Sequence, residues 1–177
     1  ADPVAQAGLA RPPLVGIAGN GLAPTRTDVE SLAEAILAKS PYGVEALFVL
    51  DSDPAFVSMA PALFTSALEH VPLVVSFATH PDDTALLADW ILPQSHPFEA
   101  WDLDTTPPGV PFPLVSLAKP VLSVPQHDTR SAAQVFLELA KRLRGETAAA
   151  FPWTDVDTLI RSEVRSLYAA HRGAVIG

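Results

Sequence analysis

The chain has 177 residues, a formal net charge of -9, 49% hydrophobic residues and no cysteine. This length suits one domain, and no apolar run approaches the roughly 20 residues that a membrane-spanning helix needs. The excess of carboxylates argues against a sequence-independent grip on nucleic acid, and the lack of cysteine excludes disulfides, thiolate zinc sites and iron–sulfur ligation within these residues. We therefore predict a single soluble domain over residues 1–177.

Short apolar runs alternate with segments of helical periodicity in the first half of the chain. Four runs are predicted strands, and three periodic segments between them are predicted helices: strands at 14–18, 46–50, 73–77 and 90–92, and helices at 27–37, 61–69 and 82–88. Thr27 followed by Glu30 fits a capping box at the start of the first helix. This alternation predicts an α/β fold, a Rossmann-like three-layer domain with a parallel sheet.

The composition changes between residues 93 and 127. Eight prolines fall in this segment, and because they obstruct regular backbone hydrogen bonding, we predict an irregular proline-rich excursion there. Its aromatic and aliphatic content is too high for disorder, so it is expected to wrap a neighbouring surface. C-terminal helices follow, one opened by Ser131 and ended by Gly145, and one from about residue 155 to 170.

Three polar loops follow the first three predicted strands. They span residues 19–21, 51–54 and 78–83. Because the carboxyl ends of parallel strands meet at one edge of a sheet, where ligands bind in doubly wound folds, we expect these loops to form a site. Turn formation and helix capping explain the aspartates of the loops equally well.

The ligand of such a site is not a plain nicotinamide dinucleotide, because Pro24 replaces the third glycine of the dinucleotide fingerprint. Carboxylates instead suit the adjacent N–H donors of a guanine edge. The candidate cofactor-binding residues, which we expect to contact the ligand, are Asn20, Ser52, Asp53, Thr79 and Asp83.

One short motif carries an alternative. The sequence His80-Pro81-Asp82-Asp83 resembles the His-Pro-Asp-Asp-Glu motif of zinc-dependent deacetylases of the N-acetylglucosaminyl-lipid type. That resemblance implies His80 and Asp83 as metal ligands and Asp82 as a base. Thr84 replaces the glutamate of the motif, and no His-x-x-His pair follows, so the hydrolase is the lesser alternative.

A second resemblance covers almost the whole chain. Residues 47–56, 71–77, 82–93 and 99–101 resemble the molybdopterin guanine dinucleotide-binding region of the dimethyl sulfoxide reductase family. Residues 107–121, 128–130 and 151–153 resemble its polysulfide and thiosulfate reductase branch, which includes the molybdopterin-like subunit of menaquinone reductase. The resemblance implies a cofactor-cradling α/β domain or fragment of a molybdopterin oxidoreductase subunit.

The sequence departs from this family at two motifs. The family's Asn-Pro corresponds to Asp53-Pro54, and its Asp-Glu-Thr-Ala corresponds to the segment 82–85. The resemblance implies molybdopterin guanine dinucleotide as the cofactor, or a scaffold that has lost it. Asp89 and Glu99 are assigned structural roles, and no catalytic residue or metal ligand is assigned.

The family's iron–sulfur segment, molybdenum ligand and C-terminal barrel cannot be located in these residues, so the chain is not a catalytically complete enzyme alone. The resemblance implies electron transport in a bacterial respiratory complex, with the remaining domains of the same subunit and iron–sulfur and membrane-anchor subunits as partners. The periplasmic face of the membrane is favoured over the cytoplasmic face. The alternative is a structural docking module of such a complex that binds no nucleotide.

Overall fold

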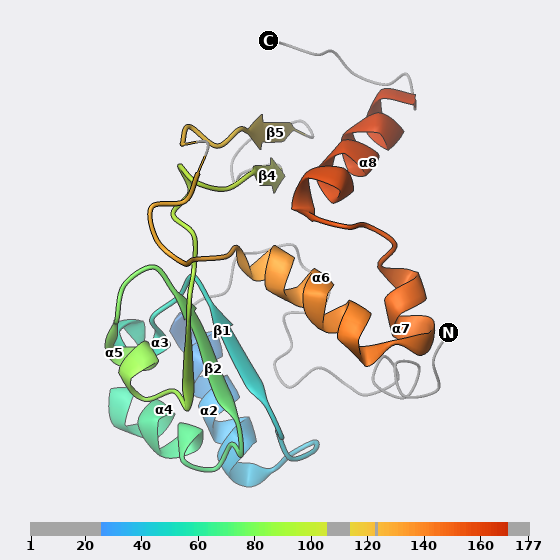
Figure 1. Ribbon diagram of the computed structural model, residues 1–177. Helices are drawn as coiled ribbons and strands as arrows, with labels where there is room; N and C mark the ends of the chain where they lie inside the picture. Colours follow the sequence, from blue (N-terminus) through green and yellow to red (C-terminus); the bar gives the residue numbers. More distant parts are fainter. Residues whose placement is uncertain (1–25, 106–113, 123, 170–177) are drawn as a thin grey trace. The chain divides into compact units, whose positions relative to one another are not determined.

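The computed structural model describes residues 26–105, 114–122 and 124–169 (Figure 1). These residues form two compact units. The first unit contains the described chain up to Ser95 together with residues 126–129, and the second contains residues 96–125 and the chain from Arg130 onward. The two units are described separately below.

The first unit is built on a three-stranded parallel sheet with the strand order β1-β2-β3 (Figure 1). The strands are β1 (Leu47–Leu50), β2 (Val74–Ala78) and β3 (Trp90–Pro93). All five residues of β2 are buried, as expected for the central strand of a covered sheet. The parallel sheet and its helices confirm the predicted α/β, Rossmann-like fold. The strand predicted at residues 14–18 lies outside the described residues.

The described part of the first unit contains the helices α2 (Arg26–Ala38), α3 (Pro54–Val57), α4 (Pro61–Leu68) and α5 (Asp83–Leu86). Helices α2 and α4 pack against each other and, with the start of β2, enclose the apolar core. The fully buried side chains of this core come from all three elements, and they include Ala33, Ile36, Phe64, Ala67, Leu68 and Val74. The alternation of strand and helix seen in the sequence therefore becomes a sheet backed by a helical layer.

Glu30 has a tertiary role in this unit. Its Oε1 accepts hydrogen bonds from the Ser58 hydroxyl at 2.8 Å and from the Met59 N–H at 2.7 Å. The bond from Ser58, assisted by that from Met59, lowers the pKa of Glu30 below its ordinary value. The Glu30 carboxylate therefore ties α2 to the turn between α3 and α4.

Helix α2 begins at Arg26, so Thr27 lies inside the helix and the predicted helix start at Thr27 is wrong.

The second unit contains a two-stranded antiparallel ribbon within the segment predicted to be irregular. Strand β4 (Asp102–Thr105) pairs with β5 (Val115–Ala118), and Leu103 lies opposite Leu117. No proline of the segment falls within either strand, so the backbone donors of the ladder are intact. The prolines lie outside the two strands and therefore do not interrupt the hydrogen bonds between them.

Among its described residues, the second unit also contains the helices α6 (Ala132–Leu143), α7 (Gly145–Ala150) and α8 (Val156–Ala169). The Ser131 hydroxyl accepts a hydrogen bond from the Gln134 N–H at 3.2 Å, which confirms the predicted N-cap of α6. Arg144, with φ of 58°, separates α6 from α7, so Gly145 begins a further helix that was not predicted. Within the described ranges, none of the helices has the length and apolar content needed to cross a membrane.

Candidate functional site

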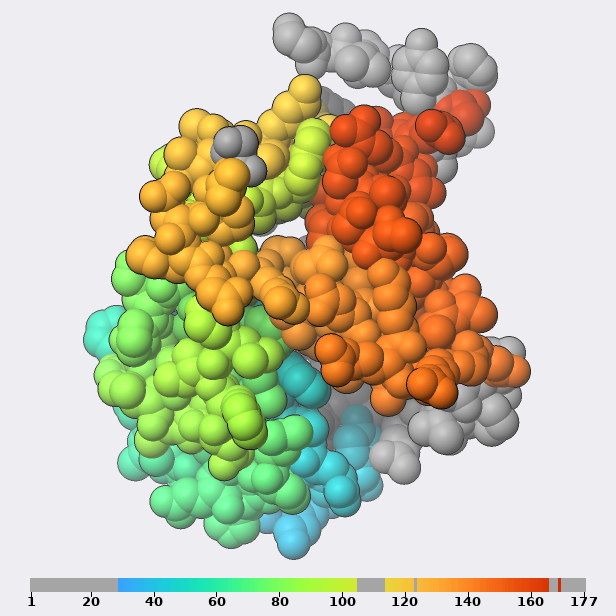
Figure 2. All heavy atoms as spheres, viewed as in Figure 1, coloured from blue at the N-terminus to red at the C-terminus, as the bar shows by residue number. Residues whose placement is uncertain are grey.

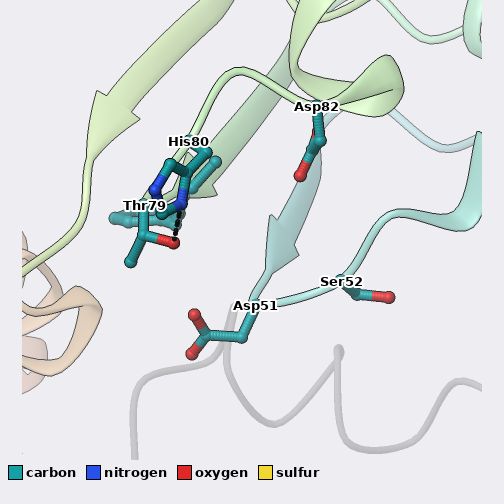
Figure 3. A pocket seen from close by; sticks show the side chains of 7 residues that line it. Asp51, Ser52, Thr79, His80 and Asp82 are labelled. Atoms are coloured by element: carbon teal, nitrogen blue, oxygen red, sulfur yellow. Dashed lines mark hydrogen bonds between the residues drawn. The ribbon is translucent and has the colours of Figure 1, made fainter. Parts of the chain in front are cut away.

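A pocket of about 270 Å³ lies where β1 and β2 end (Figure 3). Two loops supply its walls: the one that follows β1 and the one that joins β2 to α5. The lining residues are Asp51, Ser52, Phe77, Ala78, Thr79, His80 and Asp82. Because the two strands are parallel neighbours, their loops open at the same edge of the sheet. The structure thus brings together two of the three loops expected to form a site.

Two of the candidate residues line this pocket. Ser52 approaches from the β1 side, and Thr79 lies on the opposite wall beside His80 (Figure 3). The Thr79 Oγ1 and the His80 Nδ1 are 3.1 Å apart and share a hydrogen bond. Both hydroxyl-bearing side chains are exposed and can donate or accept a hydrogen bond to a ligand.

Asp53, a third candidate, makes internal contacts and is not among the lining residues. Its Oδ1 accepts hydrogen bonds from the Thr84 N–H at 3.0 Å and from the Thr84 hydroxyl at 2.6 Å. The Thr84 Oγ1 in turn accepts one from the Ala55 N–H at 2.9 Å. Since Thr84 is fully buried, this network fastens the loop after β1 to the loop after β2.

The remaining candidates lie elsewhere. Asp83 stands exposed in the first turn of α5, outside the lining residues, and Asn20 lies outside the described residues. Asp82, the neighbour of Asp83, lines the pocket. It also caps α5, because its Oδ1 accepts a hydrogen bond from the Ala85 N–H at 2.7 Å. One of these two adjacent carboxylates therefore faces the pocket while the other lies beside it.

Asp51 and Gln94 form a second link at the same edge of the sheet. The Gln94 Nε2 lies 2.6 Å and 2.7 Å from the two carboxylate oxygens of Asp51. Asp51 has φ of 47°, a left-handed conformation that aspartate tolerates better than most residues. Sequence reasoning placed Asp51 in one of the candidate loops but not among the expected ligand contacts, and it did not identify Gln94. Gln94 follows β3 directly, so its place at the end of a parallel strand was the available signal.

The structural assignments of Asp89 and Glu99 are confirmed by their hydrogen bonds. The Asp89 Oδ2 accepts a bond from the Val74 N–H at 2.7 Å, at the turn that leads from α5 into β3. The Glu99 Oε2 accepts one from the His96 N–H at 3.3 Å. Both carboxylates satisfy backbone donors, which is the role expected of them.

The pocket is lined by two carboxylates, two hydroxyls and an imidazole, with no lysine or arginine among its lining residues. Such a set of groups accepts hydrogen bonds from N–H and O–H donors of a ligand. In the part of the chain that the structure describes, no group of three or more histidine, aspartate or glutamate side chains could hold a metal ion. The zinc-hydrolase alternative therefore gains no support from these residues.

No protein-family model matches the chain, but it is similar to known proteins. The chain is 30% identical, over 116 residues, to the menaquinone reductase molybdopterin-binding-like subunit of Nitratidesulfovibrio vulgaris. The match covers 66% of this chain but 17% of that protein. The fold is similar to that of acetylene hydratase from Pelobacter acetylenicus, with a TM-score of 0.55 and 28% identity over 73% of this chain and 17% of that one. Together, these similarities support a relationship of the chain to the molybdopterin oxidoreductase superfamily.

Proposed function

We propose that the first unit cradles a molybdopterin guanine dinucleotide as part of a respiratory oxidoreductase subunit. One observation carries this proposal: a polar pocket lies at the carboxyl edge of a parallel sheet, in a chain similar to a molybdopterin-binding-like subunit. Ligands of open α/β sheets bind in that position.

The lining groups suit the guanine end of this cofactor. Guanine presents adjacent N–H donors, which the carboxylates of Asp51 and Asp82 can accept. The hydroxyls of Ser52 and Thr79 can bond to the ribose or to the base. Contacts from Asn20, Asp53 and Asp83 stay predictions.

The family branch, the location and the partners of the whole protein are also proposals, because the chain spans 17% of the length of the curated relative. We place it in the polysulfide, thiosulfate and menaquinone reductase branch, on the periplasmic side of a bacterial membrane complex. The remaining domains of the subunit and iron–sulfur and membrane-anchor subunits would be its partners. The cofactor and those partners would carry the electrons, and this unit would orient the cofactor.

Titration of the whole chain with purified molybdopterin guanine dinucleotide, followed by calorimetry and thermal melting, tests the proposal. We expect heat of binding and a raised melting temperature. Ser52→Ala should weaken binding by about twofold to tenfold, the effect of one neutral hydrogen bond. The control Ser31→Ala, an exposed change on α2, should bind like the parent chain. The absence of both heat of binding and thermal stabilisation at millimolar cofactor would refute the proposed function.

A second candidate is a docking module that holds partner proteins without a nucleotide. The second unit favours it, because the ribbon segment exposes several large apolar side chains: Phe98 at 60%, Val121 at 76% and Val124 at 67%. Figure 2 shows the segment around β5 at the visible surface. The Phe98 carbonyl accepts hydrogen bonds from the Val121 and Leu122 N–H groups, and these bonds hold Phe98 close to Val121. Exposed apolar side chains that lie together are typical of interaction surfaces. A failed cofactor titration would favour this candidate.

A further inference from the structure

We infer that a patch of exposed apolar side chains on α3 and α5 binds a segment of a partner protein in which apolar side chains are flanked by lysine or arginine. The α3–α5 patch consists of the exposed apolar residues of these two helices and of the turns that follow them. Its members are Phe56, Val57, Met59, Leu86 and Leu87. None of them lines the pocket, so this surface is independent of nucleotide binding.

The two helices bury their small residues and expose their large apolar ones. They pack against each other and lie side by side in Figure 1. The Ala55 N–H donates to the Thr84 hydroxyl at 2.9 Å, and these two residues are 8% and 0% exposed. Phe56 and Leu86, in contrast, are 72% and 70% exposed, and Met59 is 74% exposed. A helix normally turns its large apolar side chains toward the core, so this reversed arrangement is typical of a surface that another molecule covers.

The backbone beneath the patch is already held in place by hydrogen bonds. The Asp53 carboxylate, at the start of α3, accepts bonds from the Thr84 N–H at 3.0 Å and from the Thr84 hydroxyl at 2.6 Å, which join α3 to α5. The Met59 N–H donates to the Glu30 carboxylate at 2.7 Å, which fixes the turn after α3. Binding therefore does not need to order this backbone, and it costs less conformational entropy than binding to a loose loop.

The charges near the patch favour a basic partner. Asp83 is exposed and lies three residues before Leu86 in α5, so the two side chains share one face of that helix. Between Lys39 and Lys119 the sequence contains no lysine or arginine, whereas aspartate and glutamate recur throughout it. Lysine or arginine at the rim of an apolar contact would lie opposite carboxylates and complement them.

The same charges disfavour other occupants of an apolar surface. A second copy bound through the same patch would bring the Asp83 carboxylates of the two chains together, and each chain has a net charge of -9. An anionic lipid surface would be repelled in the same way. The α3–α5 patch therefore fits a basic amphipathic protein segment.

Two synthetic amphipathic helical peptides of about 15 residues, one of leucine and lysine and one of leucine and glutamate, test this assignment on the whole chain. Fluorescence anisotropy of the labelled peptides measures binding. We expect the lysine peptide to bind at least about tenfold more tightly than the glutamate peptide, because only the charge differs between them. Raising NaCl from about 50 mM to about 300 mM should weaken binding of the lysine peptide about threefold, since salt screens attraction between opposite charges.

Leu86→Ser should weaken binding of the lysine peptide about tenfold or more, because the contact loses one leucine side chain that the peptide buries. Leu86 is exposed in the free chain, so the variant should fold, which circular dichroism verifies. Val121→Ser is the matched control, because Val121 is 76% exposed but lies in the second unit. This control should bind the lysine peptide like the parent chain.

Asp83→Asn tests the charge separately from the apolar contact. It should weaken binding of the lysine peptide about twofold and reduce the dependence of that binding on salt. Glu34→Gln removes one exposed carboxylate from α2, outside the patch, and should change neither quantity.

Absence of lysine-peptide binding, or binding that Leu86→Ser leaves unchanged, would overturn the assignment. Sedimentation velocity of the parent chain at about 100 µM tests a second copy as the occupant, and flotation with vesicles of phosphatidylglycerol and phosphatidylcholine tests lipid. Self-association or vesicle binding that Leu86→Ser abolishes would assign the patch to that occupant and contradict the basic protein segment. A monomer that ignores the vesicles and binds the lysine peptide through Leu86 would support it.

Discussion

At the scale of single residues, Thr84 is the link between the two pocket loops. Its hydroxyl donates to Asp53 and accepts from the Ala55 N–H, and its side chain is 0% exposed. Among the described residues, no other side-chain hydrogen bond between the two loops is as deeply buried. The Thr84 hydroxyl, together with the Thr84 N–H that also donates to Asp53, therefore helps to fix the position of the pocket walls.

Thr84→Val should lower the free energy of unfolding by about 2–3 kcal/mol, because it leaves the partly buried Asp53 carboxylate with one donor fewer and the buried Ala55 N–H without its acceptor. Urea denaturation followed by circular dichroism measures this change. Thr84→Ser keeps the hydroxyl and should cost about 1 kcal/mol, for the lost methyl group. A valine variant as stable as the serine variant would show that the network contributes little.

Asp51 and Asp53 show how far residue-level prediction reaches. The turn Asp51-Ser52-Asp53-Pro54 was identified from the sequence as part of a site, and it borders the pocket. Its sequence cannot reveal which carboxylate faces outward. The partner of Asp53 lies 31 residues away and that of Asp51 lies 43 residues away, so only tertiary packing decides which carboxylate remains available to a ligand.

At the scale of elements, the N-cap of α6 is a feature that sequence reasoning placed correctly. Ser131 and Gln134 predicted the start of α6, and the hydrogen bond between them confirms it. A cap acts within one turn of the chain, so local sequence is enough to identify it. The side chains of Ala132, Leu137 and Ala140 then bury one face of this helix.

Ser131→Ala should therefore destabilise the chain by about 1 kcal/mol, because the Gln134 N–H loses its acceptor at the exposed end of the helix. Ser131→Asp is the matched control, since aspartate is as good an N-cap as serine and should retain stability. Thermal melting of both variants measures the difference. Equal melting temperatures for the alanine variant and the parent chain would contradict the assignment of this cap.

The missed elements have physical explanations. Helices α3 and α7 contain four and six residues, too few to display the apolar periodicity that identifies a helix. The ribbon of β4 and β5 was hidden by the prolines around it, which suggested an irregular segment. Only the pairing of Leu103 with Leu117, two residues on separate strands, reveals the ribbon.

At the scale of the whole molecule, the chain passes between its two compact units repeatedly. It leaves the first unit after Ser95, returns for residues 126–129 and leaves again. Ser95 and Thr129, whose hydroxyl oxygens are 3.2 Å apart, are the residues at which the chain leaves the first unit for the first and the second time. Neither unit is one continuous stretch of chain, and the single domain predicted for residues 1–177 stays a prediction.

One domain implies one cooperative unfolding transition. Leu137→Ala, a change in the buried face of α6 expected to cost about 2–5 kcal/mol, should then reduce hydrogen-exchange protection in β2 as well as in α6. Mass spectrometry of peptides from both elements measures protection. Protection lost in α6 and retained in β2 would show that the units unfold separately, and Phe64→Ala provides the reciprocal test from the first unit.

The sequence by itself determined the class of fold and predicted the edge of the sheet at which the pocket lies, because the periodicity of strands and helices and the polar loops that follow strands can be recognised in short stretches of chain. Tertiary structure alone decided which groups of that edge remain available to a ligand. Asp53, Thr84 and Gln94 find partners 29 to 43 residues away, and these bonds commit polar groups of the loops to one another. The chemistry of the pocket follows from which donors and acceptors those distant contacts leave unoccupied.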